Sequence, residues 1–155
     1  GAKVTLIDIN PARAELARTL GLKFATPDDA PVECELVVHT SADPRGLATA
    51  LDIAGDEATI LEMSWYGAGS VPVPLGGAFH SRRLKIVSSQ VGKVAPSRRA
   101  TTSHRQRLQQ AIELLADARL DALLMPAVRF YELPARISEI LDPKSGVLCQ
   151  LIAYP

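Results

Sequence analysis

An aspartate that ends a short apolar run is the first residue in the sequence suited to ligand binding. Asp8 ends the run from Lys3 to Asp8, whose branched apolar residues predict a strand buried on both faces. In a parallel α/β sheet, ligands bind at the carboxyl ends of the strands. A carboxylate there can accept two hydrogen bonds from the diol of an adenosine ribose, or it can cap the next turn, and its position alone leaves both alternatives open. Arg13 follows in the first turn of a predicted helix, where it can stack on an adenine or, as we favour, remain solvated.

Polar residues also follow two later predicted strands. Thr40-Ser41 comes after Leu36 to His39, and Ser64-Trp65-Tyr66 comes after Ala58 to Met63. Their backbone groups can line a groove across the sheet. The alternative is that they form turns and helix caps, as Ser and Thr commonly do, and that the single tryptophan covers the sheet edge.

Other kinds of site are disfavoured by the residue pattern. The three histidines, His39, His80 and His104, are dispersed, and none pairs with a cysteine at ligand spacing, so no metal site is predicted from this chain alone. No Gly-x-Ser-x-Gly motif occurs, and no Ser-His-acid order can be singled out. No Gly-x-Gly-x-x-Gly phosphate loop occurs either. The basic cluster from Arg98 to Arg107 lacks interleaved aromatic residues and is predicted to be a solvated helix start.

Length and composition predict one ordinary folded domain. The 155 residues carry 17 Lys and Arg against 17 Asp and Glu, and 47% of them are hydrophobic. Zero formal charge gives no global attraction to nucleic acid or an acidic membrane, and the apolar runs are too short for a transmembrane helix. Cys34 and Cys149 lie too far apart in sequence to suggest a disulfide framework. No secretory signal is visible, so a cytoplasmic location is the default expectation.

The first residues suggest that the chain was cut from something longer. The sequence opens on Gly1 with no initiator Met, and a strand begins within a few residues. Gly1 can equally be a scar from tag removal, so truncation is an expectation only.

Alternation of apolar runs and capped helices predicts a parallel sheet. Strands are expected over 3–8, 36–39, 58–63, 84–88 and 147–152, and helices over 11–20, 47–54, 99–116 and 133–141. Strand-helix-strand alternation at this spacing is typical of a parallel sheet with crossover helices. The strict alternation ends near Ser89 to Val94, which predicts a boundary between residues 1–90 and 91–155.

The order of these segments resembles the C-terminal half of the medium-chain dehydrogenase/reductase family, the zinc-type alcohol dehydrogenases. Three stretches resemble the second, fourth and fifth Rossmann strands, each with its adjoining helix or turn: GAKVTLIDINPARAELARTLG, ELVVHTSADPRGLATAL and ATILEMSWYG. The sixth strand is matched by FHSRRLKIVSSQVG. The closing helices and last strand are matched by RQRLQQAIELLADARLDALL, FYELPARISEIL and VLCQLIAYP. Within the family, SWYG and SSQVG resemble bacterial members near the bacteriochlorophyllide and polyol dehydrogenases.

The resemblance implies a nicotinamide dinucleotide bound across the sheet and hydride transfer to or from an alcohol, polyol or carbonyl carbon. It implies ribose contacts at Asp8, an adenosine-side contact at Arg13 and groove lining at Thr40, Ser64 and Trp65. It also places Ser89 and Gln90 beside the nicotinamide. An acid at Asp8 favours NAD over NADP, because a 2′-phosphate would meet like charge.

The sequence departs from the family at its most important elements. The family's first strand, glycine-rich loop and first helix have no counterpart here, and neither do its catalytic-zinc ligands and proton relay. The expected fold is therefore α/β, an incomplete Rossmann-type parallel sheet followed by the closing segment of the catalytic domain. No catalytic residue is predicted, and the chain alone is expected to be inactive. The parent is expected to use NAD and zinc, to act on a small alcohol or carbonyl compound and to be a homo-oligomer, with no nucleic-acid or membrane partner.

A second hypothesis is non-enzymatic. The chain can be a free-standing α/β module that binds a nucleotide or a protein and has no redox chemistry. The codons upstream of Gly1 discriminate: an open frame with a glycine-rich loop favours the dehydrogenase, and a start codon favours the module.

The resemblance also predicts a gap in the sheet. In the strand order 3-2-1-4-5-6, the first strand lies between the second and the fourth, and no strand of this chain naturally lies between Lys3 to Asp8 and Leu36 to His39. Each buried unsatisfied backbone group costs about 1–3 kcal/mol against a total stability of about 5–15. A strand from a neighbouring molecule, an upstream segment or rearranged pairing can fill the gap. Direct pairing of the two flanking strands, about 4.8 Å apart, is the simplest rearrangement, and it would abolish the cofactor groove.

Overall fold

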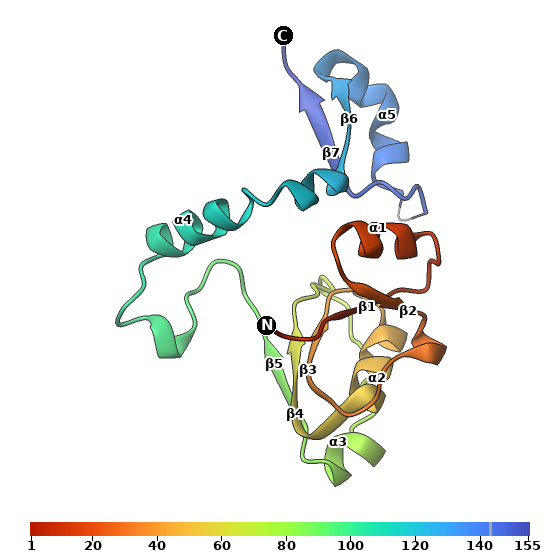
Figure 1. Cartoon of the computed structure of the whole chain (residues 1–155), viewed down its shortest axis with the longest axis vertical. Coiled ribbons are helices and arrows are strands. Elements are labelled where there is room, and N and C mark those ends of the chain that lie inside the picture. The colour runs from red at the N-terminus through yellow and green to blue at the C-terminus, as the bar shows by residue number, and fades with distance from the viewer. Residues whose placement is uncertain (143) are drawn as a thin grey trace.

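The chain alternates short strands and helices along most of its length (Figure 1). The computed structural model describes residues 1–142 and 144–155. Its strands and helices are β1 (Thr5–Ile7), α1 (Arg13–Thr19), β2 (Lys23–Ala25), η1 (Pro27–Asp29), β3 (Cys34–His39), α2 (Pro44–Ile53), β4 (Ala54–Glu62), α3 (Gly77–Ser81), β5 (Lys85–Ser88), η2 (Pro96–Arg98), α4 (His104–Leu114), η3 (Ala118–Leu123), β6 (Leu124–Arg129), η4 (Phe130–Glu132), α5 (Leu133–Ile140) and β7 (Cys149–Ala153), where η is a 3₁₀ helix.

The first strand forms a small unit with the helix and strand after it. Asn10 Oδ1 accepts the N–H of Ala12 at 3.0 Å just before α1, and Gly21 ends the helix turn with a φ of +74°, which glycine adopts at no steric cost. The strand β2 then pairs in parallel with β1. The sequence predicted a loop from Ala25 onward and no strand before it, since three residues are too few to show a strand period.

The main core surrounds a three-stranded parallel sheet, β3-β4-β5. Asp43 accepts the N–H of Arg45 at 2.8 Å and caps α2, and Pro44 occupies the first helical position. Helix α2 then buries its apolar side against the sheet. Leu51 and Ile60 are the largest fully buried side chains, and Leu47, Ala50, Ala54, Ala58 and Leu84 complete the cluster.

The C-terminal part, from η2 onward, buries fewer of its residues than the part before it. Helix α4 projects away from the sheets, and Figure 1 shows it beside an extended loop. None of its residues is buried, and it begins at His104 rather than at the predicted residue 99, because Ser103 and Gln106 form a reciprocal capping box. A parallel pair, β6-β7, ends the fold. The sequence did not predict β6, which contains Pro126, a residue that weakens a strand pattern.

The predicted gap persists, but the expected rearrangement does not occur. Among the described residues β1 pairs only with β2, and the sheet β3-β4-β5 lies apart from that pair. Direct pairing of the two flanking strands, the simplest of the three alternatives, therefore does not occur in the described residues. The β1-β2 unit is held by the C-terminal part instead, because Arg13 Nη1 donates to Gly146 O at 3.2 Å and Arg119 Nη1 donates to Leu20 O at 3.1 Å.

These features confirm the predicted fold class. The fold is α/β with small parallel sheets, in the pieces expected of a Rossmann-type sheet without its first strand. Cys34 and Cys149 are both free thiols, as predicted. In the described part of the chain, no helix is both long and apolar enough to cross a membrane.

Candidate functional site

Three adjacent strands end at the same level with polar residues. His39 at the end of β3 lies opposite Glu62 at the end of β4, and Glu62 lies opposite Ser88 at the end of β5. Parallel pairing makes this alignment, because it brings the carboxyl ends of all three strands to one edge. That edge is where α/β sheets bind their ligands.

A chain of hydrogen bonds runs through the buried imidazole of His39. Its Nδ1 lies 2.7 Å from Glu62 Oε2, and its Nε2 lies 2.7 Å from Ser41 Oγ. The His39 side chain is 5% exposed and that of Glu62 is 13% exposed. An ionised carboxylate can only accept, so Nδ1 carries the hydrogen, and the tautomer with Nδ1–H leaves Nε2 as the acceptor for the Ser41 hydroxyl.

Glu62 is held in its ionised form by its neighbours. Burial raises the pKa of the Glu62 carboxyl, but hydrogen bonds from Ser64 and His39 outweigh this effect and hold the pKa below its ordinary value. The backbone N–H of Ser64 donates to Glu62 Oε1 at 2.7 Å. Burial and the nearby Glu62 charge raise the pKa of the Tyr66 hydroxyl, which donates to Glu62 Oε2 at 3.3 Å. The carboxylate therefore accepts from three separate residues.

Helix α2 approaches this cluster closely at a glycine. A β-carbon at position 46 would overlap Ser41 Oγ and would lie 2.8 Å from His39 Nε2. Because Gly46 has no side chain, the pair formed by Ser41 and His39 fits beneath the first turn of α2. The backbone N–H of Asp43, at the start of that turn, also donates to Ser41 Oγ at 3.2 Å.

Five of the predicted site residues lie around this edge. Thr40 is exposed, and the Trp65 side chain is 87% exposed. Ser64 Oγ accepts the N–H of Ala42 at 3.1 Å and so joins the two strand ends. The N–H of Ser89 donates to Glu62 O at 2.8 Å, and the side chain of Gln90 accepts the N–H of Gly92.

The other two predicted residues lie on the β1-β2 unit. Asp8 is partly buried, and its Oδ1 accepts the N–H of Asn10 at 2.7 Å. Asp8 therefore caps the turn, one of the two alternatives considered, and no protein group in the described residues donates to Oδ2. Arg13 is partly exposed, and its Nη1 donates to Gly146 O at 3.2 Å.

The group at the centre of the site was not predicted from the sequence. No Ser-His-acid order could be singled out in the sequence, but in the structure Ser41, His39 and Glu62 form one hydrogen-bonded chain. A usable signal was present: His39 and Glu62 each end a buried strand, and neighbouring parallel strands place such residues side by side.

Solved structures with the same fold include dehydrogenases and proteins solved with a bound nicotinamide cofactor. 2R,3R-butanediol dehydrogenase from Bacillus subtilis matches 98% of this chain with a TM-score of 0.69 and 11% identity, and the match covers 44% of that protein. Bacillus subtilis protein yhfP, solved with NAD bound, matches 98% of this chain with a TM-score of 0.67 and 18% identity, and the match covers 47% of that protein. Escherichia coli YHDH, solved with bound NADPH, has the same values. No family model matches the sequence, and a comparison with curated proteins finds no match either.

These likenesses define the fold of the chain. It shares the Rossmann-type α/β fold of the matched parts of these proteins, as the sequence resemblance predicted, and it spans less than half of their length. At sequence identities of 11% and 18%, these matches establish the shared fold. In the described part of the chain, no three His, Cys, Asp or Glu side chains come together to hold a metal ion.

Proposed function

We propose that this chain is part of a nicotinamide-dependent dehydrogenase that transfers hydride between the cofactor and an alcohol, polyol or carbonyl compound. The observation that carries the proposal is the match of nearly the whole chain to dehydrogenases and to proteins solved with bound NAD or NADPH. The chain alone is inactive in this proposal, since it holds no glycine-rich phosphate loop.

The cofactor site in this proposal is the set of strand ends. Asp8 Oδ2, which accepts from no described protein group, is available to a ribose hydroxyl while Oδ1 keeps the turn closed. A negative charge at this position disfavours the 2′-phosphate of NADP, so we assign NAD as the preferred cofactor. Thr40, Ser64 and Trp65 line the groove, and Ser89 and Gln90 lie on the nicotinamide side. Arg13 reaches the adenosine only if its bond to Gly146 is given up.

The remaining expectations concern the whole parent protein. We propose a small alcohol or carbonyl substrate, a homo-oligomer in the cytoplasm, zinc bound by residues outside this chain, and no nucleic-acid or membrane partner. A bound zinc ion would polarise the substrate oxygen, and the residues of this chain would orient the cofactor.

The experiment that tests the proposal measures cofactor preference in the intact parent. Asp8→Ser should lower kcat/KM with NAD relative to NADP, because ribose hydrogen bonds to a charged group are each worth about 1.5–3 kcal/mol. Asp28→Ser, at an exposed acid of η1, is the matched control and should leave the ratio unchanged. An unchanged ratio in Asp8→Ser contradicts the assignment.

The isolated chain gives a second readout. Among the described residues β1 pairs only with β2 and β3 only with β4, so no strand joins the two sheets, and calorimetric titration of the purified 155-residue chain should detect no NAD binding. Micromolar affinity would contradict the importance of the gap and would favour the second hypothesis, a self-sufficient nucleotide-binding module.

A further inference from the structure

We propose that Ser41 is a reactive serine, activated by His39 and oriented through Glu62, and that it accepts an acyl group from a carboxylic ester. This inference goes beyond hydride transfer and does not require a nicotinamide cofactor. Its basis is geometric: acid to imidazole and imidazole to hydroxyl both span 2.7 Å, within the range expected of a nucleophile and its general base.

The position of Ser41 in the fold suits a nucleophile. It lies on the short connection between strand β3 and helix α2 and is exposed, while the His39 ring beneath it is buried. The next residue, Ala42, has a φ of +52°, an uncommon conformation for a residue with a side chain. Strand, strained turn and helix also present the nucleophile in serine hydrolases of the α/β type, although the sequence here is not their motif.

Gly46 keeps the reacting pair in contact. A β-carbon there would overlap Ser41 Oγ, so any other residue would displace the hydroxyl from His39. The helix itself does not require glycine at this position, because glycine is less favourable than alanine in a helix interior by roughly 1 kcal/mol. The requirement comes from the contact with Ser41.

Donors for a developing oxyanion lie beside the hydroxyl. The backbone N–H of Ala42 follows the nucleophile directly, and it donates to Ser64 Oγ at 3.1 Å. A substrate oxygen that takes the place of Ser64 Oγ can accept from this N–H, and the Ser64 hydroxyl can rotate its hydrogen toward the same oxygen. The carboxylate of Asp43, the residue after Ala42, would oppose an oxyanion, and its ion pair with Arg45 at 2.6 Å partly neutralises that charge.

The two half-reactions balance without a further reagent. Ser41 Oγ attacks the ester carbonyl carbon, its proton passes to His39 Nε2, and the alcohol leaves with that proton. Water then attacks the acyl-serine, gives its proton to His39 and releases the acid as the proton returns to Ser41. Glu62 touches no reacting atom. It is a positioning residue that holds Nδ1–H and so directs Nε2 toward the serine.

A covalent probe tests the proposal on the 155-residue chain as it is. Incubation with an alkyl fluorophosphonate and intact-mass measurement should show one probe per folded chain, and peptide mapping should place it on Ser41. Ser41→Ala should abolish labelling, and His39→Gln should slow it by at least about 100-fold, the usual contribution of a general base. Ser70→Ala, at an exposed loop serine, is the control and should label at the normal rate.

Two further variants separate activation from folding. Gly46→Ala should slow labelling although no hydrogen-bonding side chain has changed. Glu62→Gln should slow it and shift its pH profile, because the groups that face His39 are Glu62 and Tyr66 from the end of β4 and Asp43 at the start of α2.

The mapping itself decides the outcome even if Ser41→Ala fails to fold. Absence of a probe on Ser41 in the folded wild-type chain overturns the proposal, as does labelling that persists at the same rate in His39→Gln or after denaturation. Labelling does not depend on NAD, so a failed cofactor experiment leaves this result unaffected, and the reverse also holds.

Discussion

His39 is the only polar residue among the described residues that the fold buries outright, and its hydrogen bonds explain why this is tolerated. A buried polar group without partners costs about 1–3 kcal/mol. Both ring nitrogens of His39 have partners, and in the described residues no buried side-chain nitrogen or oxygen lacks one. The cluster therefore specifies one arrangement of the strand ends, because any other would leave a donor or an acceptor unpaired.

Acid stability should report on the same cluster. Because the pKa of Glu62 is lowered in the folded chain, its ionisation stabilises the fold above the ordinary glutamate value of 4.5, and this contribution is lost as the pH falls through the lowered value. Glu62→Gln should remove this part of the pH dependence while lowering stability at pH 7. Urea unfolding of both proteins across the acidic range up to pH 7 measures it, and Glu57→Gln, at an exposed acid of β4, is the control. Parallel pH profiles for wild type and Glu62→Gln would show that Glu62 contributes nothing.

At the scale of elements, packing stabilises helix α2, whereas capping stabilises helix α4. Helix α2 is fixed by burial: Leu51 is 1% exposed and lies in the main core. Leu51→Ala should lower the free energy of unfolding by about 2–5 kcal/mol, the cost of a large-to-small change in a core. Leu114→Ala, at an exposed position of α4, should cost far less. Urea denaturation of the two variants makes the comparison, and equal losses would contradict the assigned core.

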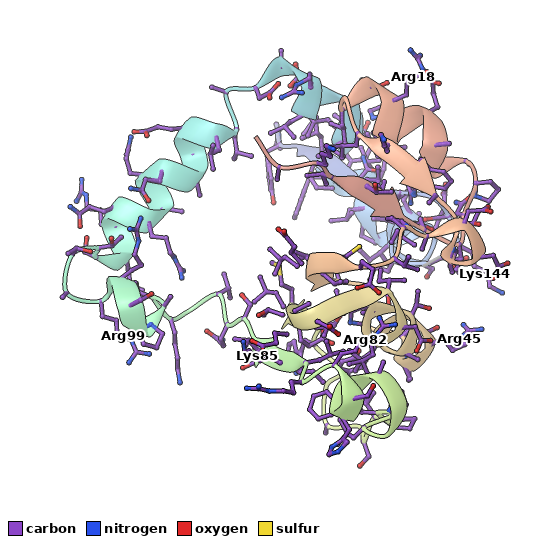
Figure 2. All side chains as sticks on the ribbon, turned by 60° about the horizontal axis from the view of Figure 1, so that its bottom comes forward. Arg18, Arg45, Arg82, Lys85, Arg99 and Lys144 are labelled. Carbon is purple, nitrogen blue, oxygen red and sulfur yellow. The ribbon has the colours of Figure 1, made fainter. Side chains whose placement is uncertain are left out.

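Helix α4 depends on its cap instead. It buries no residue, and its His104 and Arg107 bond to the backbone carbonyls of Gly92 and Lys93. Figure 2 shows the helix on the same projecting segment as Arg99. Ser103→Ala removes one half of the capping box and should cost the helix about 1 kcal/mol. Hydrogen exchange of the α4 amides should accelerate several-fold, while those of α2 keep their rates. Ser97→Ala, upstream in η2, controls for a serine without a capping bond.

At the scale of the whole molecule, the chain is unusually open. Its accessible surface is 11653 Å², whereas a compact monomer of 16.6 kDa should expose about 7,600 Å². Part of this extra area is the exposed surface of large apolar side chains on several elements, among them Leu36 and Val38 of β3 and Leu108 and Ile112 of α4. Exposed apolar area of this extent is typical of a surface that another part of a protein covers.

Solution measurements can check this openness. A compact domain of 155 residues has a radius of gyration of about 15 Å, and small-angle scattering of the isolated chain should give a clearly larger value. The chain should also bind the apolar dye ANS under native conditions. A radius near the compact value, without dye binding, would show that the chain closes on itself in solution.

Local sequence signals were enough to predict the alternation of strands and helices, the α/β class and the free cysteines. Periodicity marks an amphipathic element, and caps such as Asn10 and Asp43 with Pro44 mark where helices begin, because both act through neighbours a few residues apart. They also located Thr40, Ser64 and Trp65 at strand ends. They could not show the short strands β2 and β6, which depend on a partner strand.

The tertiary structure alone decided which side chains meet. His39 and Glu62 lie 23 residues apart and become neighbours only through the register of β3 on β4, while Gly46 acquires its role only where α2 crosses Ser41. The same holds for the β1-β2 unit, since Arg13 donates to the Gly146 carbonyl and Arg119 donates to the Leu20 carbonyl. Contacts of this kind arise from pairing across long sequence separations, on which no local pattern reports.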